Sequence, residues 1–228
     1  MKKFLFALTV IIFCTAPAVA QIAPSKAEIA SYTGLLAATA KGDIATIKNL
    51  VAGGADINTR DSYGRTPVMV SAHLKDHKTA LALIKLGANL NLLEHDVYDV
   101  LTISGVIDDV KMVDLALKHG ANAKLTTSVY DGTALIAAAH LGHDGVVRSL
   151  IKGGSNLDHI NNLQWTALIE SIVLGNGGKR HQACLKALID AGANVNIPDG
   201  NGVTPLTLAH AAGYKEMVKM LEAAGAKP

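Results

Sequence analysis

The chain has 228 residues, half of them apolar, with few aromatic side chains and a formal charge of +2. Residues 1–20 contain Lys2 and Lys3 and no acid, so the remainder carries equal numbers of basic and acidic side chains. A neutral chain with interspersed charges has no electrostatic footprint for nucleic acid or an anionic membrane, and we expect neither as a partner.

The first twenty residues have the pattern of a cleaved signal peptide. A positive start is followed by an almost wholly apolar run over residues 4–13, too short to span a bilayer, and by an Ala-Val-Ala site ending at Ala20. Cys14 raises the alternative of a lipid anchor, which the bulky Phe13 before it disfavours. We therefore expect a mature domain of residues 21–228 without membrane insertion, in the bacterial periplasm or, alternatively, secreted.

Two markers recur in the mature chain with a spacing of about 33 residues. A glycine followed by a small residue stands at Gly54, Gly87, Gly120, Gly154, Gly192 and Gly225. A threonine or aspartate stands at Thr33, Thr66, Asp99, Thr133, Thr166 and Thr204. Because both markers keep one period, the chain is predicted to be a stack of similar units that bury their apolar faces against one another.

Each unit has the features of two helices joined by a tight turn. The Thr or Asp is an N-cap, whose side-chain oxygen accepts an otherwise unpaired backbone N–H. Apolar pairs such as Leu83-Ile84 mark the second helix, and the glycine ends it in a left-handed turn. Asn or Asp two residues later fits the turn that leads onward. The expected repeats cover about 25–61, 62–95, 96–128, 129–161, 162–199 and 200–228.

Three repeats depart from the common pattern. In the first, Ser25 and Glu28 form a capping box that starts the first helix early and should extend it past its counterparts. The third is the most degenerate, with Asp108 where four of the other repeats have Gly42, Gly142, Gly175 and Gly213. The fifth carries extra residues, placed at 176–180 in the turn between its helices, which form either a mobile turn, the reading we favour, or an additional contact finger.

The motifs Thr66-Pro67-Val68, Thr204-Pro205-Leu206 and Gly-Ala-Asp-Ile-Asn at 54–58 resemble the ankyrin repeat, over nearly all of residues 31–228. The resemblance implies an all-α solenoid of about six helix-turn-helix repeats with hairpin-like connecting turns. The histidine usual after Thr-Pro-Leu in that family is absent here, so we expect a polar link between repeats to be missing. The chain also resembles small exported ankyrin-repeat proteins of Gram-negative bacteria, which implies a helper or inhibitor of another exported protein.

In the ankyrin family, the two positions seven and eight after each cap face the concave side and contact partners. In this chain they form an apolar stripe with two histidines. The stripe consists of His73, Leu74, Val106, Ile107, His140, Leu141, Val173 and Leu174. Monomers seldom leave such a stripe exposed, so we favour a contact surface over the alternative that these side chains cover one another.

The loops before the caps add aromatic residues, with polar neighbours such as Arg65. The aromatic residues are Tyr63, Tyr98, Tyr130 and Trp165. Aromatic anchors inside a polar rim are typical of protein interfaces, although each aromatic ring could instead pack against the adjacent turn.

Two other kinds of site find weaker support. The pairs His73/His77 and His140/His143 have ligand-like spacing but lack converging partners, so capping or surface roles are favoured over a metal site. Cys184 is expected to be a semi-buried, inert thiol, with a reactive thiol as the alternative.

Residue spacing indicates no nucleophile–base pair and no paired carboxylates, so we expect no catalytic residues, no cofactor and no metal. The sequence predicts a monomeric, non-catalytic scaffold in the bacterial envelope. It would engage a partner protein through the apolar groove and aromatic turn tips, as helper or inhibitor of an exported enzyme. The alternatives are a secreted effector that binds a host protein and a small-molecule or metal receptor that uses the groove histidines.

Overall fold

The computed structural model describes residues 23–228, so the expected signal peptide and Cys14 lie outside the described residues. All regular secondary structure in residues 23–228 is helical, as thirteen helices, which confirms the all-α solenoid. None of the helices in this part of the chain has the length and apolar character needed to cross a bilayer.

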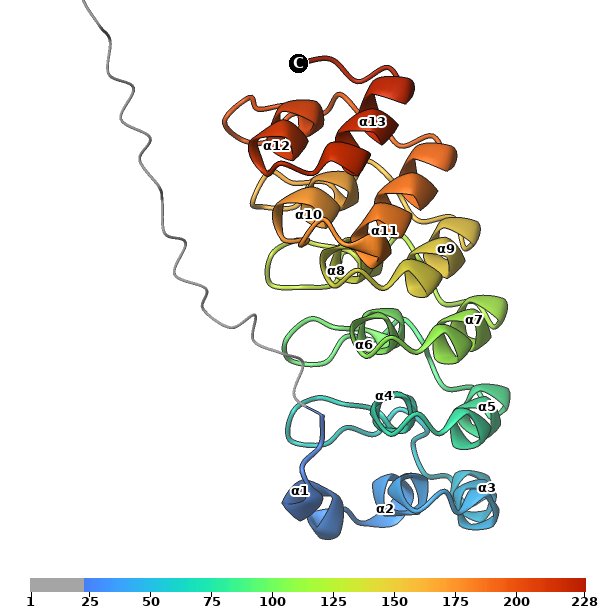
Figure 1. Cartoon of the computed structure of the whole chain (residues 1–228). Helices are drawn as coiled ribbons and strands as arrows, with labels where there is room; N and C mark the ends of the chain where they lie inside the picture. Colours follow the sequence, from blue (N-terminus) through green and yellow to red (C-terminus); the bar gives the residue numbers. More distant parts are fainter. Residues whose placement is uncertain (1–22) are drawn as a thin grey trace, which may run out of the picture.

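Six helix pairs stack in chain order (Figure 1). The first members of the pairs, called the inner helices, are α2 (Gly34–Ala40), α4 (Pro67–His73), α6 (Val100–Val106), α8 (Ala134–His140), α10 (Ala167–Val173) and α12 (Pro205–Ala211). The second members, called the outer helices, are α3 (Ile44–Ala52), α5 (His77–Lys85), α7 (Val110–Lys118), α9 (Asp144–Lys152), α11 (Lys179–Asp190) and α13 (Lys215–Ala223). The connecting loops project beside the inner helices, on the side away from the outer row (Figure 1).

The predicted N-caps are confirmed at four inner helices. Asp99 accepts the backbone N–H of Thr102 at 2.7 Å. The aspartate that replaces the threonine of the other repeats therefore keeps the N-cap. Thr133, Thr166 and Thr204 accept the equivalent N–H at 3.3 Å. Thr33 and Thr66 begin α2 and α4 without such a bond. Because the first turn leaves N–H groups unpaired, the bonded caps fix where those helices start.

The marker glycines and the polar residues after them form a second set of local contacts. All six glycines have positive φ, between 82° and 97°, as predicted. Asn89 accepts the N–H of Asn91 at 2.9 Å, and Asn91 in turn accepts the N–H of Asn122 in the next repeat at 2.8 Å. These turns therefore supply hydrogen bonds between neighbouring repeats, at a place other than the position where the histidine of the family is absent.

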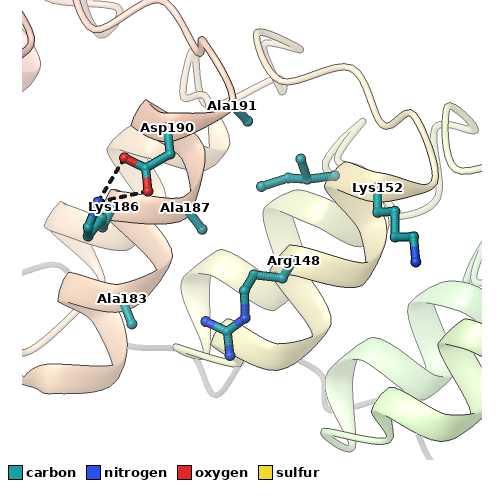
Figure 2. A pocket seen from close by; sticks show the side chains of 8 residues that line it. Arg148, Lys152, Ala183, Lys186, Ala187, Asp190 and Ala191 are labelled. Carbon is teal, nitrogen blue, oxygen red and sulfur yellow. Dashed lines mark hydrogen bonds and ion pairs between the residues drawn. The ribbon is translucent and has the colours of Figure 1, made fainter.

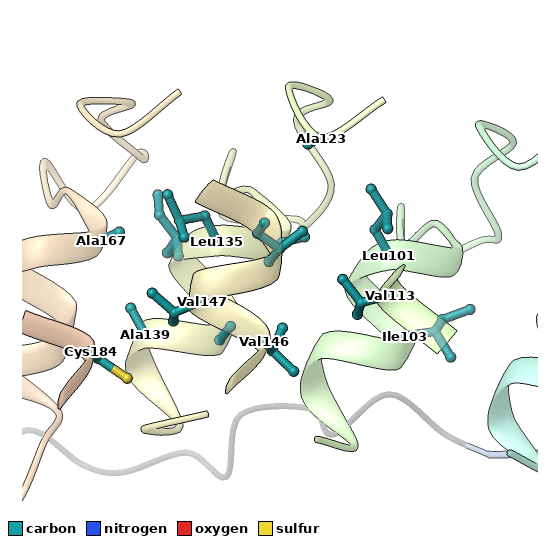
Figure 3. Close-up of a cluster of buried hydrophobic side chains, with 14 of the residues drawn as sticks. Leu101, Ile103, Val113, Ala123, Leu135, Ala139, Val146, Val147, Ala167 and Cys184 are labelled. Atoms are coloured by element: carbon teal, nitrogen blue, oxygen red, sulfur yellow. The ribbon is translucent and has the colours of Figure 1, made fainter. Parts of the chain in front are cut away.

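One continuous apolar core runs along the stack between the two rows of helices. Figure 3 shows part of it, with Leu101 and Val113 of one pair beside Leu135 and Val146 of the next. Each of these side chains is fully buried, and burying a side chain of this size stabilises the fold by about 2 kcal/mol. The core holds the inner helices side by side and so fixes the spacing of the surface they present.

The first helix differs from the prediction. The capping box of Ser25 and Glu28 is present, and α1 starts at Lys26, but it ends at Ser31 and does not continue into α2. The chain is extended at Thr33, and α1 lies beside α2 opposite α3, in line with the connecting loops (Figure 1). Contacts with the second repeat hold it there, since the Tyr32 hydroxyl donates to Asp61 at 2.7 Å. The short helix therefore occupies the place of a first connecting loop.

The extra residues of the fifth repeat also differ from the predicted turn. Lys179 and Arg180 belong to the first turn of α11, which has 12 residues where the other outer helices have nine. Arg180 donates to Asp108, two repeats away, at 2.7 Å, and lies 3.4 Å from Asp144. The Tyr214 hydroxyl of the sixth repeat donates to the backbone carbonyl of Gly175 at 2.9 Å. The insertion thus lengthens a helix and contacts the third, fourth and sixth repeats.

Candidate partner-binding surface

The groove residues, defined as the eight residues of the predicted stripe, lie at the C-terminal ends of α4, α6, α8 and α10. Leu74, Leu141, Val173 and Leu174 expose between 37% and 43% of their surface. His73, Val106, Ile107 and His140 are partly buried. The stack therefore presents large apolar side chains to solvent at three of the four repeats, and its third repeat is the most covered.

The loops before the caps share one internal geometry, which sets the direction of their side chains. In the second repeat, Asp61 Oδ1 accepts the backbone N–H groups of Tyr63 and Arg65, both at 2.9 Å. In the fifth, Asn161 Oδ1 accepts those of Leu163 and Trp165, at 3.0 and 2.9 Å. The residue three before the cap stands at the tip of the loop, and the residue one before the cap turns back towards the inner helix.

This geometry divides the predicted aromatic edge into two classes. Tyr63 and Tyr130 are tip residues and are exposed by 41% and 46%. Tyr98 and Trp165 stand one before the cap and are partly buried. Tyr98 packs against the core, and burial raises the pKa of its hydroxyl. The two classes were merged in the sequence analysis because all four residues are aromatic and precede a cap.

Arg65, expected in the polar rim, is buried, with 1% of its surface exposed. Its Nε lies 2.7 Å from Asp61 Oδ2, it also pairs with Glu28 of α1, and its guanidinium carbon lies 4.6 Å from the centre of the Tyr63 ring. A guanidinium can be buried in this way because two carboxylates neutralise it. Arg65 therefore holds α1 to the second repeat and does not belong to the exposed rim.

The structure adds three exposed apolar residues that the sequence analysis missed, namely Val129, Ile160 and Leu163. Leu163 occupies the same tip position as Tyr63 and Tyr130, and that register could have identified it. The backbone N–H of Asn162 donates to the carbonyl of Tyr130 at 2.9 Å, which joins the loops of the fourth and fifth repeats. These two loops form the most apolar part of the edge.

The histidine pairs do not converge on shared sites. His77 Nε2 lies 2.8 Å from Asp109 of the next repeat, and His143 Nδ1 lies 2.7 Å from the carbonyl oxygen of Gly105 in the previous one. Nowhere in residues 23–228 do three or more His, Cys, Asp or Glu side chains form a group that could hold a metal ion. The Nδ1 atom of His73 is buried without a hydrogen-bond partner within the described residues, and burial lowers the pKa of this imidazole to about 4.

Cys184, expected to be semi-buried, is fully buried in the core beside α9 (Figure 3). Burial raises the pKa of its thiol to about 12. Since the thiolate is the reactive form, the environment of Cys184 is that of a packing residue.

The groove contains one buried carboxylate, which belongs to Glu170 of α10. Asn161 Nδ2 donates to Glu170 Oε1 at 2.9 Å, and His140 Nδ1 of α8 lies 3.3 Å from Glu170 Oε2. Only 4% of the Glu170 side chain is exposed, against 36% of the His140 side chain. Glu170 is the fourth residue after the cap Thr166, and at the same position the other inner helices carry Ala37, Val70, Ile103, Ala137 and Leu208. The sequence signal for Glu170 was therefore an acid at a position that is otherwise apolar.

A shallow hollow of about 430 Å³ lies on the opposite face, between α9 and α11. Ala183, Ala187 and Ala191 line one side of it (Figure 2). Of its cations, Lys186 is bound to Asp190 at 2.8 Å and Arg148 to Asp144 at 2.7 Å. Because two of the three cations that line it, Arg148 and Lys186, are neutralised on their own helices, the hollow is a weaker candidate than the groove.

Comparisons with known proteins agree with this geometry. The family model described as ankyrin repeats (3 copies) matches residues 103–199. The putative ankyrin repeat protein YahD of Escherichia coli is 34% identical over 192 residues, which cover 84% of this chain and 95% of that protein. The crystal structure of an ankyrin repeat domain from Acinetobacter baumannii superposes with a TM-score of 0.80 at 41% identity, covering 85% of this chain and 98% of that one.

A second similar structure is a chain from the complex of the predatory endopeptidase of Bdellovibrio bacteriovorus with an immunity protein. Its TM-score is 0.69 at 26% identity, and the match covers 85% of this chain and 98% of that chain.

Proposed function

Because the chain belongs to the ankyrin-repeat family, whose members are generally protein-binding scaffolds, we propose that it binds another protein through its groove residues and loop tips. The observation that carries this proposal is the exposure of Leu74, Leu141, Val173 and Leu174 in one row. Exposed apolar patches of this kind are typical of interaction surfaces. The loop tips Tyr130 and Leu163 are also exposed, and tyrosine is among the residues that dominate interface energies.

The second part of the proposal is that the scaffold is monomeric, has no catalytic activity and acts in the bacterial envelope, as helper or inhibitor of an exported enzyme. The leader-like residues 1–20 support export. The likeness to a chain from an endopeptidase–immunity protein complex supports an enzyme as the partner. A secreted effector that binds a host protein is the alternative if the protein is found outside the bacterial cell.

A crosslinking experiment in the bacterial envelope tests both parts. The tagged protein would be crosslinked in living cells and the proteins recovered would be quantified for wild type, Leu141→Asp and Leu174→Asp. Ala45→Asp is the matched control, because Ala45 is exposed in the first turn of the outer helix α3, where an acid suits the helix dipole. We expect one exported protein to be recovered with wild type and Ala45→Asp and lost with both groove variants. Recovery that is independent of Leu141 and Leu174 would refute the groove as the binding surface.

A further inference from the structure

The turns that follow the outer helices are joined from repeat to repeat by one recurring hydrogen bond. A side-chain oxygen of the residue four after the marker glycine accepts the backbone N–H of the residue two after the marker glycine of the next repeat. The pairs of acceptor and donor are Asn58 and Asn89, Asn91 and Asn122, Asp158 and Asn194, and Asn196 and Lys227, all at 2.8 to 2.9 Å. A carboxamide and a carboxylate both serve as the acceptor.

The joint between the third and fourth repeats lacks this bond. Lys124 occupies the acceptor position there, and an ammonium group can only donate. The turn of the fourth repeat nevertheless keeps its shape, since Asn156 Oδ1 accepts the N–H of Asp158 at 3.2 Å, as the equivalent side chains do in the other turns. The backbone N–H of Asn156 is therefore oriented as in those turns, but no group of residues 23–228 accepts it.

A hollow of about 420 Å³ lies at this joint, lined by Lys124 and residues 154–158. Lys124 is exposed, and its ammonium group has no ion pair or hydrogen bond within the described residues. Ser155 is 8% exposed, stands where the other five repeats have alanine, and has a buried hydroxyl oxygen without a partner in this part of the chain. Leaving a buried hydroxyl unpaired is costly. The hollow thus brings together three hydrogen-bond donors that find no acceptor within residues 23–228.

The charges that line the hollow indicate which ligand fits. Besides Lys124, the charged lining residue is Asp158, whose Oδ1 accepts the N–H of Asn194 at the following joint. A cation would therefore find one carboxylate with an oxygen already engaged. An anion with a hydrogen-bonding oxygen would find the ammonium group of Lys124 and the N–H of Asn156, both unpaired within the described residues, and hydrogen bonds between charged groups are the stronger ones. The donors favour an anion, against some repulsion from Asp158.

We propose that this hollow, called the joint site and defined as Lys124 with residues 154–158, binds a carboxylate group that accepts the Asn156 N–H and pairs with the Lys124 ammonium group. The ligand's carboxylate takes the place that an Asn or Asp side chain has at the other four joints. Two sources share this chemistry, namely an aspartate or glutamate side chain of a bound protein and a free dicarboxylate. The joint site lies at the turns after the outer helices, whereas the groove residues end the inner helices, so this binding goes beyond the proposed function.

An NMR titration of the isotope-labelled protein tests the contact at a named atom. The probes are N-acetyl-aspartate N-methylamide, its uncharged asparagine analogue, and succinate. We expect the blocked aspartate to shift the Asn156 amide signal saturably, with millimolar affinity because the ligand must displace water from exposed groups. The asparagine analogue should bind about threefold more weakly, since it lacks the charge that pairs with Lys124. Tighter binding of succinate than of the blocked aspartate would assign the joint site to a free dicarboxylate, and the reverse order to a protein side chain.

Lys124→Asn is the decisive variant, because it supplies the side chain that the other joints have. The Asn156 amide should become protected from hydrogen exchange, and the blocked aspartate should no longer shift its signal. Lys111→Asn is the matched control, since Lys111 is exposed in the first turn of α7, at the other end of that helix, and the same change there should leave binding unaltered. Asp158→Asn keeps an acceptor for Asn194 and removes the negative charge, so it should tighten binding about threefold.

A second variant separates the charge from the open N–H. Lys124→Met removes the ammonium group without supplying an acceptor, so it should bind the blocked aspartate no better than wild type binds the asparagine analogue. The inference is overturned if no carboxylate probe shifts the Asn156 amide signal, or if Lys124→Asn and Lys124→Met bind the blocked aspartate as wild type does. Either result leaves the proposed groove function standing, because the crosslinking experiment tests that function through other residues.

Discussion

The ion pair of Arg65 makes a quantitative prediction about the N-terminal end of the stack. Arg65 is 1% exposed, the side chain of Asp61 is 3% exposed, and Glu28 completes the pair from α1. Removing one partner of a buried pair costs about 3–5 kcal/mol, because the remaining charge stays buried without compensation. The Tyr32 hydroxyl and two backbone N–H groups still bind Asp61, so we expect Arg65→Ala to lower the free energy of unfolding by about 3 kcal/mol, the lower end of that range.

The loss should be local, because each repeat contacts only its neighbours. Urea unfolding followed by circular dichroism measures the free energy, and amide hydrogen exchange measures its location. Protection should fall in α1 to α5 and remain unchanged in α8 to α13. The control is the double variant Asp61→Asn/Arg65→Met, which removes both charges and should recover about half of the loss. A change below about 0.5 kcal/mol for Arg65→Ala, or a uniform change in exchange, would refute this account of the pair.

Three further predictions concern buried and exposed groups elsewhere. His73 is held neutral by a pKa of about 4, so wild type should lose about 2 kcal/mol between pH 7.5 and pH 5, as the unfolded chain takes up a proton that the native state excludes. In urea unfolding titrations at the two pH values, His73→Phe should not show that part of the loss. A pH dependence of its unfolding free energy equal to that of wild type would contradict the prediction. Native Cys184 should resist a thiolate-specific reagent at pH 8 and react fully in urea, since burial raises its thiol pKa to about 12. Fast native labelling would show that the core opens there. Arg180→Ala breaks an exposed pair with Asp108, so we expect a loss under about 1 kcal/mol that vanishes in 1 M salt; a larger, salt-independent loss would assign the insertion a packing role.

The period, the caps and the glycine turns could be predicted because each depends on groups only a few residues apart. A cap needs one side-chain oxygen and one nearby N–H, as Asp99 shows with Thr102. A glycine adopts the left-handed conformation because it lacks a Cβ atom, so this signal depends on the residue itself. Repetition of these local signals at about 33 residues was enough to establish paired helices in a stack. The same register also placed the groove residues at the ends of the inner helices.

The tertiary structure decided what depends on residues far apart in the chain. Arg65 was assigned to the surface because its partner Glu28 lies 37 residues earlier, across an unpredicted break between α1 and α2. The last two residues of the insertion in the fifth repeat, Lys179 and Arg180, became helical, and Arg180 makes a contact two repeats away that the favoured reading of a mobile turn did not include. The pairing of Glu170 with His140 joins two adjacent helices through side chains thirty residues apart.

The sequence by itself thus determined the architecture of this protein, because the hydrogen bonds and backbone preferences that define a repeat join residues of that same repeat. Only the tertiary structure decided which polar groups are buried and paired, because burial is a property of neighbouring repeats that the chain brings together when it stacks. Tyr63 and Arg65, two residues apart, show the difference, since one is an exposed tip and the other a buried ion pair.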